Sequence, residues 1–200
     1  ELYGSHATFA IYLLTVPKEA AALRKSYSSE KSKFVAVYGR KGVGKTSLVR
    51  NILGDRLDFE FTASCGITQR LQRRRFQNAL DLKTGSRGKV PADWFAAFDR
   101  LKDYLPSLGR ERAVVLLDGL PSMDAPKSLF ISALSYFWNG WHSESTLLKL
   151  YVCGSDGAWM TDRLIGDPGG LYGRISRQIR LAPFSLRETG EYLTRIKGIN

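Results

Sequence analysis

Residues 33–46 read KFVAVYGRKGVGKT, and this stretch decides which fold the chain adopts. Lys33–Tyr38 is rich in β-branched and aromatic side chains and is followed by a glycine, which predicts a buried strand. Gly39–Thr46 has the spacing G-x-x-x-x-G-K-[ST], and Lys45–Leu53 continues with a helical pattern. A glycine-rich turn between a strand and a helix directs backbone N–H groups, and the positive end of the helix, toward phosphate oxygens. The stretch therefore predicts a P-loop that binds a nucleoside triphosphate, which we expect to be ATP.

Two side chains of this loop have expected roles of their own. Lys45 is expected to reach the β- and γ-phosphates, and the Thr46 hydroxyl is expected to bind Mg²⁺. The alternative is a chance glycine-rich turn, but a strand before the loop and a helix after it are the context that a P-loop requires. ATP and Mg²⁺ are therefore the predicted cofactors. The predicted nucleotide contacts in the loop are Gly39, Arg40, Lys41, Gly42, Val43, Gly44, Lys45, Thr46 and Ser47.

An acidic residue follows a later apolar run. Ala113–Leu117 reads AVVLL, which predicts another buried strand, and Asp118 stands at its end. P-loop enzymes hold Mg²⁺ with help from an aspartate in this position, so Asp118 and Thr46 are the predicted metal residues. The alternative is an ordinary aspartate in a strand-to-loop turn. Gly119 stands where many ATPases carry a glutamate that orients the attacking water, and losing a positioned base costs about 10²–10⁴ in rate. We therefore expect nucleotide binding with slow hydrolysis.

The rest of the chain alternates short apolar runs with helical patterns. Further strands are expected at Phe59–Ala63, Leu147–Cys153 and Ile175–Leu181. Helices are expected at Thr68–Leu80, from Asp93 to about Leu105, from Asp124 to about Trp138, at Ala158–Ile165 and after Ser185. Strands that alternate with helices form βαβ units. The predicted fold class is therefore α/β, a P-loop NTPase fold with a mostly parallel five-stranded sheet between two layers of helices.

Composition limits the partners and the compartment. The chain has 200 residues and a formal charge of +11, so long-range attraction favours anionic partners such as nucleotides, nucleic acid or acidic proteins. Cys65 and Cys153 are too isolated to form a metal set or a disulfide framework, and we expect both to be buried, reduced thiols in a cytoplasmic protein. The apolar stretch Ala7–Val16 is shorter than the roughly 20 residues of a membrane span, so no membrane partner is expected.

Four stretches of the chain resemble the archaeal-type ATPases, a P-loop family related to the AAA+ and STAND classes and common in archaea and in bacteria such as Bacteroides. They read FVAVYGRKGVGKTSLVR (34–50), AVVLLDGLPSMDAPKSLFISALSYFWNGW (113–141), YVCGSDGAWM (151–160) and GGLYGRISRQIRLAPFSLRETGEYL (169–193). The run from FWNGW through CGS to GLYGRI and PFSL is more specific than the P-loop alone. With weaker similarity between these stretches, the resemblance covers about residues 18–200.

The resemblance implies roles for two residues near later strands. It places the fourth strand between the P-loop strand and the Asp118 strand, with Ser155 after it as a sensor of the γ-phosphate. It places Arg174 just ahead of the fifth strand, where related ATPases often carry an arginine that senses nucleotide or completes a neighbouring site, which implies self-association. Such an arginine stabilises charge on a transferring phosphate. The alternatives are a turn-capping hydroxyl for Ser155 and a solvated turn residue or structural ion pair for Arg174.

The chain departs from the family pattern in several places. The family usually reads Asp-Glu where this chain has Asp118-Gly119, and it usually has small or hydroxyl residues after CGS, where this chain has Asp156. Asp156 is therefore considered as a partial replacement for the missing glutamate, the alternative being a solvent-facing turn residue. The resemblance divides the chain into an unmatched segment 1–17, an ATPase core 18–184 and the start of a helical lid 185–200. The predicted catalytic residues are Lys45, Asp118, Asp156 and Arg174.

Three functions remain open at this point. The first is a Mg²⁺-dependent, ATP-binding AAA+-like ATPase core with weak hydrolysis. The second is a non-hydrolysing, nucleotide-dependent switch or DNA-associated protein, which Gly119 supports. The third is a small-molecule kinase, for which the sequence offers no lid rich in arginines. Arg70, Arg73, Arg74 and Arg75 cluster on one expected helix, either as contacts to DNA phosphates or as a solvated face.

Overall fold

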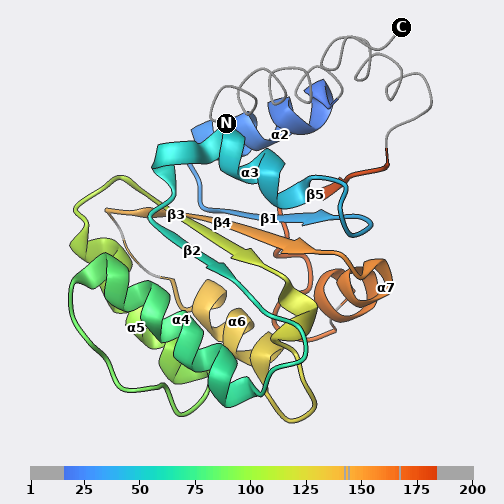
Figure 1. Cartoon of the computed structure of the whole chain (residues 1–200). Coiled ribbons are helices and arrows are strands. Elements are labelled where there is room, and N and C mark those ends of the chain that lie inside the picture. Colours follow the sequence, from blue (N-terminus) through green and yellow to red (C-terminus); the bar gives the residue numbers. More distant parts are fainter. Residues whose placement is uncertain (1–15, 142, 144, 167, 184–200) are drawn as a thin grey trace, which may run out of the picture.

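Five parallel strands form the central sheet of the structure (Figure 1). The structure is a computed structural model that describes residues 16–141, 143, 145–166 and 168–183. The strands lie in the order β2-β3-β4-β1-β5, so β4 separates the P-loop strand β1 from the Asp118 strand β3, as the resemblance implies. Their bounds are β1 Lys33–Tyr38, β2 Phe59–Thr62, β3 Arg112–Asp118, β4 Leu147–Gly154 and β5 Arg177–Arg180.

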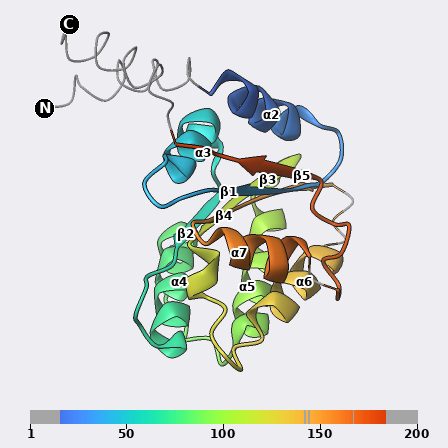
Figure 2. The same ribbon diagram turned by 90° about the vertical axis from the view of Figure 1, so that its right-hand side faces the viewer.

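Helices cover both faces of this sheet (Figures 1 and 2). One face carries α2 (Pro17–Ser28) and α3 (Lys45–Leu53), and the other carries α4 (Gln69–Thr84), α5 (Trp94–Ser107) and α6 (Phe130–Asn139). Beside the ends of the strands, α7 (Gly157–Trp159) continues into a π-helical turn at Met160–Ile165. Short 3₁₀ turns lie at Gly54–Arg56 and Leu120–Ser122. The expected three-layer α/β architecture is confirmed.

The strand before the P-loop explains why this sheet is buried on both sides. Successive side chains of a strand point to opposite faces. Phe34 and Ala36 therefore pack into the core beneath α4, α5 and α6, whereas Val35 and Val37 pack against α2 and α3. A strand with two covered faces reads as a continuous apolar run, and the buried strand that KFVAVY predicted at Lys33–Tyr38 is confirmed.

The helix expected to end at about Trp138 is present as α6, but its expected start at Asp124 is wrong, because α6 begins only at Phe130. Lys127 and Leu129 have φ angles of 64° and 54°, a left-handed conformation that interrupts a right-handed helix. Asp124 is no helix cap. Its Oδ2 accepts a hydrogen bond of 3.0 Å from the indole N–H of Trp159 and pairs with Arg163 at 3.2 Å.

Other expectations differ from the structure in detail. The helix α2 was not expected, although all of it except Pro17 lies in the segment predicted as the ATPase core. Cys153 is buried as expected, but Cys65 is exposed, so that expectation is wrong; Cys65 lies just after the end of β2, with its Sγ 3.2 Å from the Ser122 hydroxyl. The helix expected after Ser185 lies outside the described residues. Within the described part of the chain, no helix is both long and apolar enough to cross a membrane.

Candidate functional site

The P-loop runs from the end of β1 to the start of α3, between strand and helix as expected. Its first residue, Gly39, has a φ angle of 151° and lies against Leu181, the residue that follows β5. A Cβ atom at this position would lie 2.1 Å from the carbonyl oxygen of Leu181, far inside van der Waals contact. Leu181 in turn donates its backbone N–H to Tyr38 O at 2.8 Å. Only glycine therefore lets the chain turn out of β1 this close to β5.

Lys45 lies beneath the loop rather than on its surface. It is only 7% exposed, and its Nζ donates hydrogen bonds to Gly39 O at 2.9 Å and Arg40 O at 2.8 Å. Burial lowers the pKa of Lys45, while the neighbouring Cys153 and Asp118 act in the opposite direction. The ammonium group is therefore held inside the curve of the P-loop, where a phosphate group would meet it.

Thr46 and Asp118 are brought into direct contact at the same edge of the sheet. The Thr46 Oγ1 donates a hydrogen bond of 2.7 Å to Asp118 Oδ2. A hydroxyl and a carboxylate are hard oxygen ligands of the kind that Mg²⁺ prefers, and Mg²⁺ is usually held by one or two carboxylates together with substrate phosphates. No larger group of His, Cys, Asp and Glu side chains that could hold a metal occurs among the described residues. The donor set therefore fits Mg²⁺ that arrives with a nucleotide, and not a metal ion bound by protein ligands alone.

Gly119 occupies the position after Asp118 for a structural reason. Its φ angle is 74° and its ψ angle is 34°, which places it in the left-handed region. Its N–H donates to Cys153 O at 3.0 Å, and a Cβ atom would approach Ala63 O to 3.3 Å. A glutamate in this conformation would be strained and would crowd the end of β2. The backbone conformation at position 119 therefore explains why a glycine, and not a glutamate, follows Asp118.

The remaining predicted site residues lie at two different places. Ser155 and Asp156 follow β4, whose end lies between the P-loop strand and the Asp118 strand, and both are exposed. Asp156 Oδ1 accepts a hydrogen bond of 3.0 Å from Trp159 N, so it caps the helix α7. Arg174 is exposed and precedes the start of β5. It therefore lies where the strands begin, whereas the P-loop lies where they end. The structure thus brings Lys45, Thr46 and Asp118 together, leaves Ser155 and Asp156 beside them, and keeps Arg174 apart.

One residue near the site gave no sequence signal. Gln72 of α4 is fully buried, and its amide donates to Ser64 O at 2.6 Å and Ser122 O at 3.2 Å. Its Oε1 accepts from Ser64 N at 3.2 Å. This side chain joins the end of β2 to the loop after Asp118. A glutamine within an arginine-rich helix reads as one more exposed polar residue, so nothing in the sequence distinguished it.

Comparison with known proteins identifies a family model that matches the chain and several solved structures with a similar fold. The model of the family described as the NB-ARC domain matches residues 17–123. An uncharacterised protein of Methanocaldococcus jannaschii is 23% identical over 178 residues, which cover 89% of this chain and 37% of that protein. The Walker-type ATPase PABY2304 of Pyrococcus abyssi has a TM-score of 0.63 at 22% identity, covering 92% of this chain and 58% of that one.

Two ORC structures share the fold at lower identity. The ORC2 protein of Aeropyrum pernix, in ADPNP and ADP complexes, has a TM-score of 0.57 at 19% identity over 90% of this chain and 51% of its own. Drosophila ORC bound to DNA has a TM-score of 0.60 at 16% identity over 92% of this chain and 45% of its own. This chain therefore spans only part of each of these proteins, and the solved structures at these identities establish the fold.

Proposed function

The chain belongs to the NB-ARC domain family of P-loop proteins, and from this premise we propose that it binds ATP together with Mg²⁺ and hydrolyses it slowly. The observation that carries the proposal is the contact between Thr46 and Asp118 beside the buried Lys45. An ammonium group and two oxygen ligands stand where the phosphates and metal of a nucleotide would need them. Thr46 and Asp118 would hold Mg²⁺, which would neutralise charge on the phosphate oxygens when bound.

Slow hydrolysis follows from the residues around the phosphate position. Gly119 has no side chain to orient or deprotonate water. Two carboxylates lie near this position. Asp118, at the end of β3, accepts a hydrogen bond from Thr46, and Asp156, after β4, caps α7 through one oxygen. The second oxygen of Asp156 is the proposed partial substitute for a base, with Ser155 as the proposed γ-phosphate sensor. We propose that binding and hydrolysis are thereby separated in this protein.

The test is ATP titration and phosphate release on the same samples. Wild type is expected to bind Mg-ATP saturably by calorimetry, and Lys45→Ala and Asp118→Asn are expected to lose most of this affinity. Lys83→Ala, an exposed lysine near the end of α4, is the matched control for losing a lysine. A folded wild-type sample with no affinity for any nucleotide would overturn the proposal. Binding without any phosphate release above the Lys45→Ala background would leave a non-hydrolysing nucleotide switch.

Arg174 is proposed to act on a neighbouring copy rather than on its own P-loop. It lies near the start of β5, whereas Thr46 follows the end of the neighbouring strand β1, so Arg174 reaches a phosphate only in another molecule. The expected result is specific phosphate release that rises with protein concentration in wild type and is flat in Arg174→Ala. Concentration-independent turnover in both proteins would rule out this role.

A second candidate function is nucleotide-dependent association with DNA. Arg70, Arg74 and Arg75 are exposed on α4 and form no ion pair within the described part of the chain. Arg73 differs, because its Nε donates to Pro91 O at 3.0 Å. Drosophila ORC, one of the structures with this fold, is bound to DNA. Unpaired arginines on one helix suit phosphate contacts, which make binding salt-dependent.

Fluorescence anisotropy with a labelled DNA duplex tests this candidate, with and without Mg-ATP. Replacing Arg70, Arg74 and Arg75 by glutamine is expected to weaken binding and to flatten its salt dependence. The control replaces three exposed basic residues elsewhere, Lys18, Arg24 and Lys25 of α2. Equal losses in the two triple variants would reduce the effect to net charge and exclude α4 as a DNA-binding surface.

A further inference from the structure

A second pocket lies where the strands of the sheet begin, at the opposite end of the strands from the P-loop. It has a volume of about 340 Å³ and is lined by residues of α2, of the Gly54–Arg56 turn, and of the start of β3 and the residues before it. Its cationic side chains are Arg56, Arg110 and Arg112. Because β3 begins at Arg112 and ends at Asp118, the pocket and the nucleotide site occupy opposite ends of the same strand. The nucleotide site therefore does not account for this pocket.

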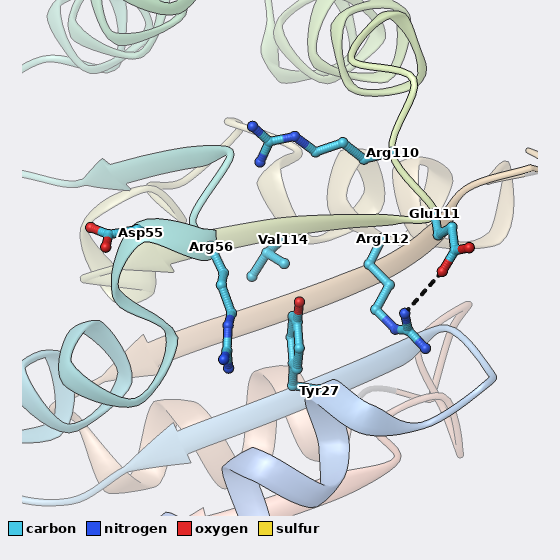
Figure 3. Close-up of a pocket in the computed structure, with 7 residues that line it drawn as sticks. All are labelled: Tyr27, Asp55, Arg56, Arg110, Glu111, Arg112 and Val114. Atoms are coloured by element: carbon cyan, nitrogen blue, oxygen red, sulfur yellow. Dashed lines mark hydrogen bonds and ion pairs between the residues drawn. The ribbon is translucent and has the colours of Figure 1, made fainter.

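Tyr27 of α2 holds two of these arginines in position. The guanidinium carbons of Arg56 and Arg112 lie 4.8 and 6.0 Å from the centroid of the Tyr27 ring. Figure 3 shows the ring edge-on, with one arginine on each side and the phenolic oxygen directed toward Val114. Attraction between a guanidinium and an aromatic face is worth about 0.5–1 kcal/mol at an exposed site. One ring thus keeps two positive charges close together.

Arg56 and Arg112 retain capacity to bind an anion. Arg56 forms no ion pair among the described residues, and Figure 3 shows its neighbour Asp55 pointing away from it. Arg112 pairs with Glu30 at 2.8 Å and Glu111 at 3.2 Å, but these carboxylates are 83% and 88% exposed. Exposed ion pairs contribute only about 0–1 kcal/mol. The Arg112 Nε is buried and has no hydrogen-bond partner, so this guanidinium is not saturated.

Arg110 has a different part in the pocket. It donates to Asp58 Oδ1 at 2.6 Å, and Asp58 Oδ2 accepts from Val114 N at 2.8 Å. The Asp58 side chain is only 2% exposed, so this carboxylate is fixed in the structure. Asp58 therefore orients Arg110 and neutralises its charge. The net attraction for an anion comes from Arg56 and Arg112.

We propose that this pocket binds a phosphate group as a dianion. A carboxylate ligand would gain little over Glu30 and Glu111, which carry the same charge and are tethered beside Arg112. A phosphate group carries a charge of about −1.5 to −2 at pH 7 and three strong acceptor oxygens, so it can pair with Arg56 and Arg112 together. The planar fork of a guanidinium also matches two phosphate oxygens at once. The proposal does not rest on ATP binding, because the pocket shares no residue with the P-loop.

The experiment follows the side-chain Nε–Hε signals of the pocket arginines by NMR at constant ionic strength, with and without Mg-ADP. The probes are inorganic phosphate, N-acetyl-O-phosphoserine amide and, as the carboxylate arm, N-acetylaspartate amide. Both phosphate probes are expected to shift the Arg56 and Arg112 signals saturably, whether or not Mg-ADP is present. A response to inorganic phosphate alone identifies a free ion as the ligand, and a response to both identifies a site that also accepts a phosphorylated side chain. Equal responses to the carboxylate probe would overturn the proposal.

Matched variants separate the pocket from the general positive charge of the chain. Arg56→Gln keeps much of the side chain, removes the charge from an exposed position and is expected to weaken phosphate binding at least tenfold. Arg177→Gln removes the same charge from an exposed arginine at the start of β5 and is expected to change affinity less than twofold. Shifts that grow linearly without saturation, or equal losses in the two variants, would show only diffuse attraction and reject the site.

Discussion

Thr46 and Asp118 are 72 positions apart in the chain, yet the Thr46 hydroxyl donates a hydrogen bond of 2.7 Å to the Asp118 carboxylate. Parallel strands produce this contact. Because β1 and β3 run in the same direction with β4 between them, the loop after β1 and the last residue of β3 emerge at the same edge of the sheet. A hydroxyl on the first turn of α3 then faces a carboxylate at the end of β3.

Removing this hydroxyl is expected to weaken Mg²⁺-dependent nucleotide binding. Thr46→Val keeps the shape of the side chain but removes the oxygen, and hydrogen bonds to charged groups contribute about 1.5–3 kcal/mol. ATP affinity in the presence of Mg²⁺ is therefore expected to fall roughly ten- to a hundredfold by calorimetry. Thr46→Ser retains the hydroxyl and is expected to bind nearly as wild type. Equal affinity of the valine and serine variants for Mg-ATP would contradict a metal role for Thr46.

Gly119 is expected to be required by its backbone conformation. A side chain at its φ angle of 74° costs about 1–2 kcal/mol, and a Cβ atom would also press on Ala63 O at 3.3 Å. Gly119→Ala is therefore expected to lower the free energy of unfolding by about this amount in urea titrations. Gly119→Asn is expected to lose less, because asparagine tolerates the left-handed region better. If both variants are as stable as wild type, the local conformation does not explain the glycine.

Much of the fold could be predicted because its signals are local. KFVAVY and AVVLL are short apolar runs that directly precede the P-loop and Asp118, and the structure places them as β1 and β3 within one residue of the expected bounds. The Lys45–Thr46–Asp118 arrangement follows from the P-loop spacing and the parallel topology. These inferences needed only neighbouring residues and one general rule about sheet edges.

The failures depended on contacts between distant segments. Asp124 has the position of a helix cap, but Trp159 and Arg163, more than thirty residues later in the chain, use its carboxylate instead. Gln72 contacts the loops of the site with its side-chain amide and Leu181 contacts Gly39 with its backbone carbonyl, and no local pattern encodes either contact. The sequence also suggested Asp156 as a base without showing that its side chain caps α7.

The two possible roles of Asp156 are separated by two substitutions. Asp156→Asn keeps an oxygen that can cap α7 but cannot accept a proton, so it is expected to keep its stability and lose residual phosphate release. Asp156→Ala also removes the cap and is expected to cost about 0.5–2 kcal/mol of stability. Thermal or urea unfolding and phosphate release under saturating Mg-ATP measure the two effects. Unchanged phosphate release in Asp156→Asn would leave the side chain with its structural role alone.

Lys149 gives a prediction about stability and pH that is independent of nucleotide. It is fully buried in β4, where its Nζ donates to Ser29 O at 2.5 Å and Lys31 O at 2.7 Å. Burial, with smaller contributions from Arg112 and Lys33 that outweigh Glu30, lowers its pKa from 10.5 to about 8. The folded state therefore releases this proton near pH 8, while the unfolded chain keeps it until about pH 10.5.

The sign of the effect follows from this order of proton release. Below pH 8 both states carry the proton, and the folded state bears the whole cost of a buried charge. As the pH rises through this window the unfolded state binds more protons, so the stability of wild type is expected to increase. At 1.36 kcal/mol per pKa unit, the gain from Lys149 between pH 8 and pH 9.5 is about 1.5 kcal/mol.

Lys149→Met, which lacks the titrating group but has similar length, isolates this contribution. The difference between the unfolding free energies of wild type and Lys149→Met is expected to shift in favour of wild type from pH 8 to pH 9.5, because other titrating groups are common to both proteins. Urea titrations at several pH values measure it, and Lys31→Met, an exposed lysine in the loop that Lys149 contacts, controls for the loss of a lysine. A difference that stays constant across this range would mean that Lys149 remains charged in the folded protein, and that its two carbonyl partners offset its burial in full.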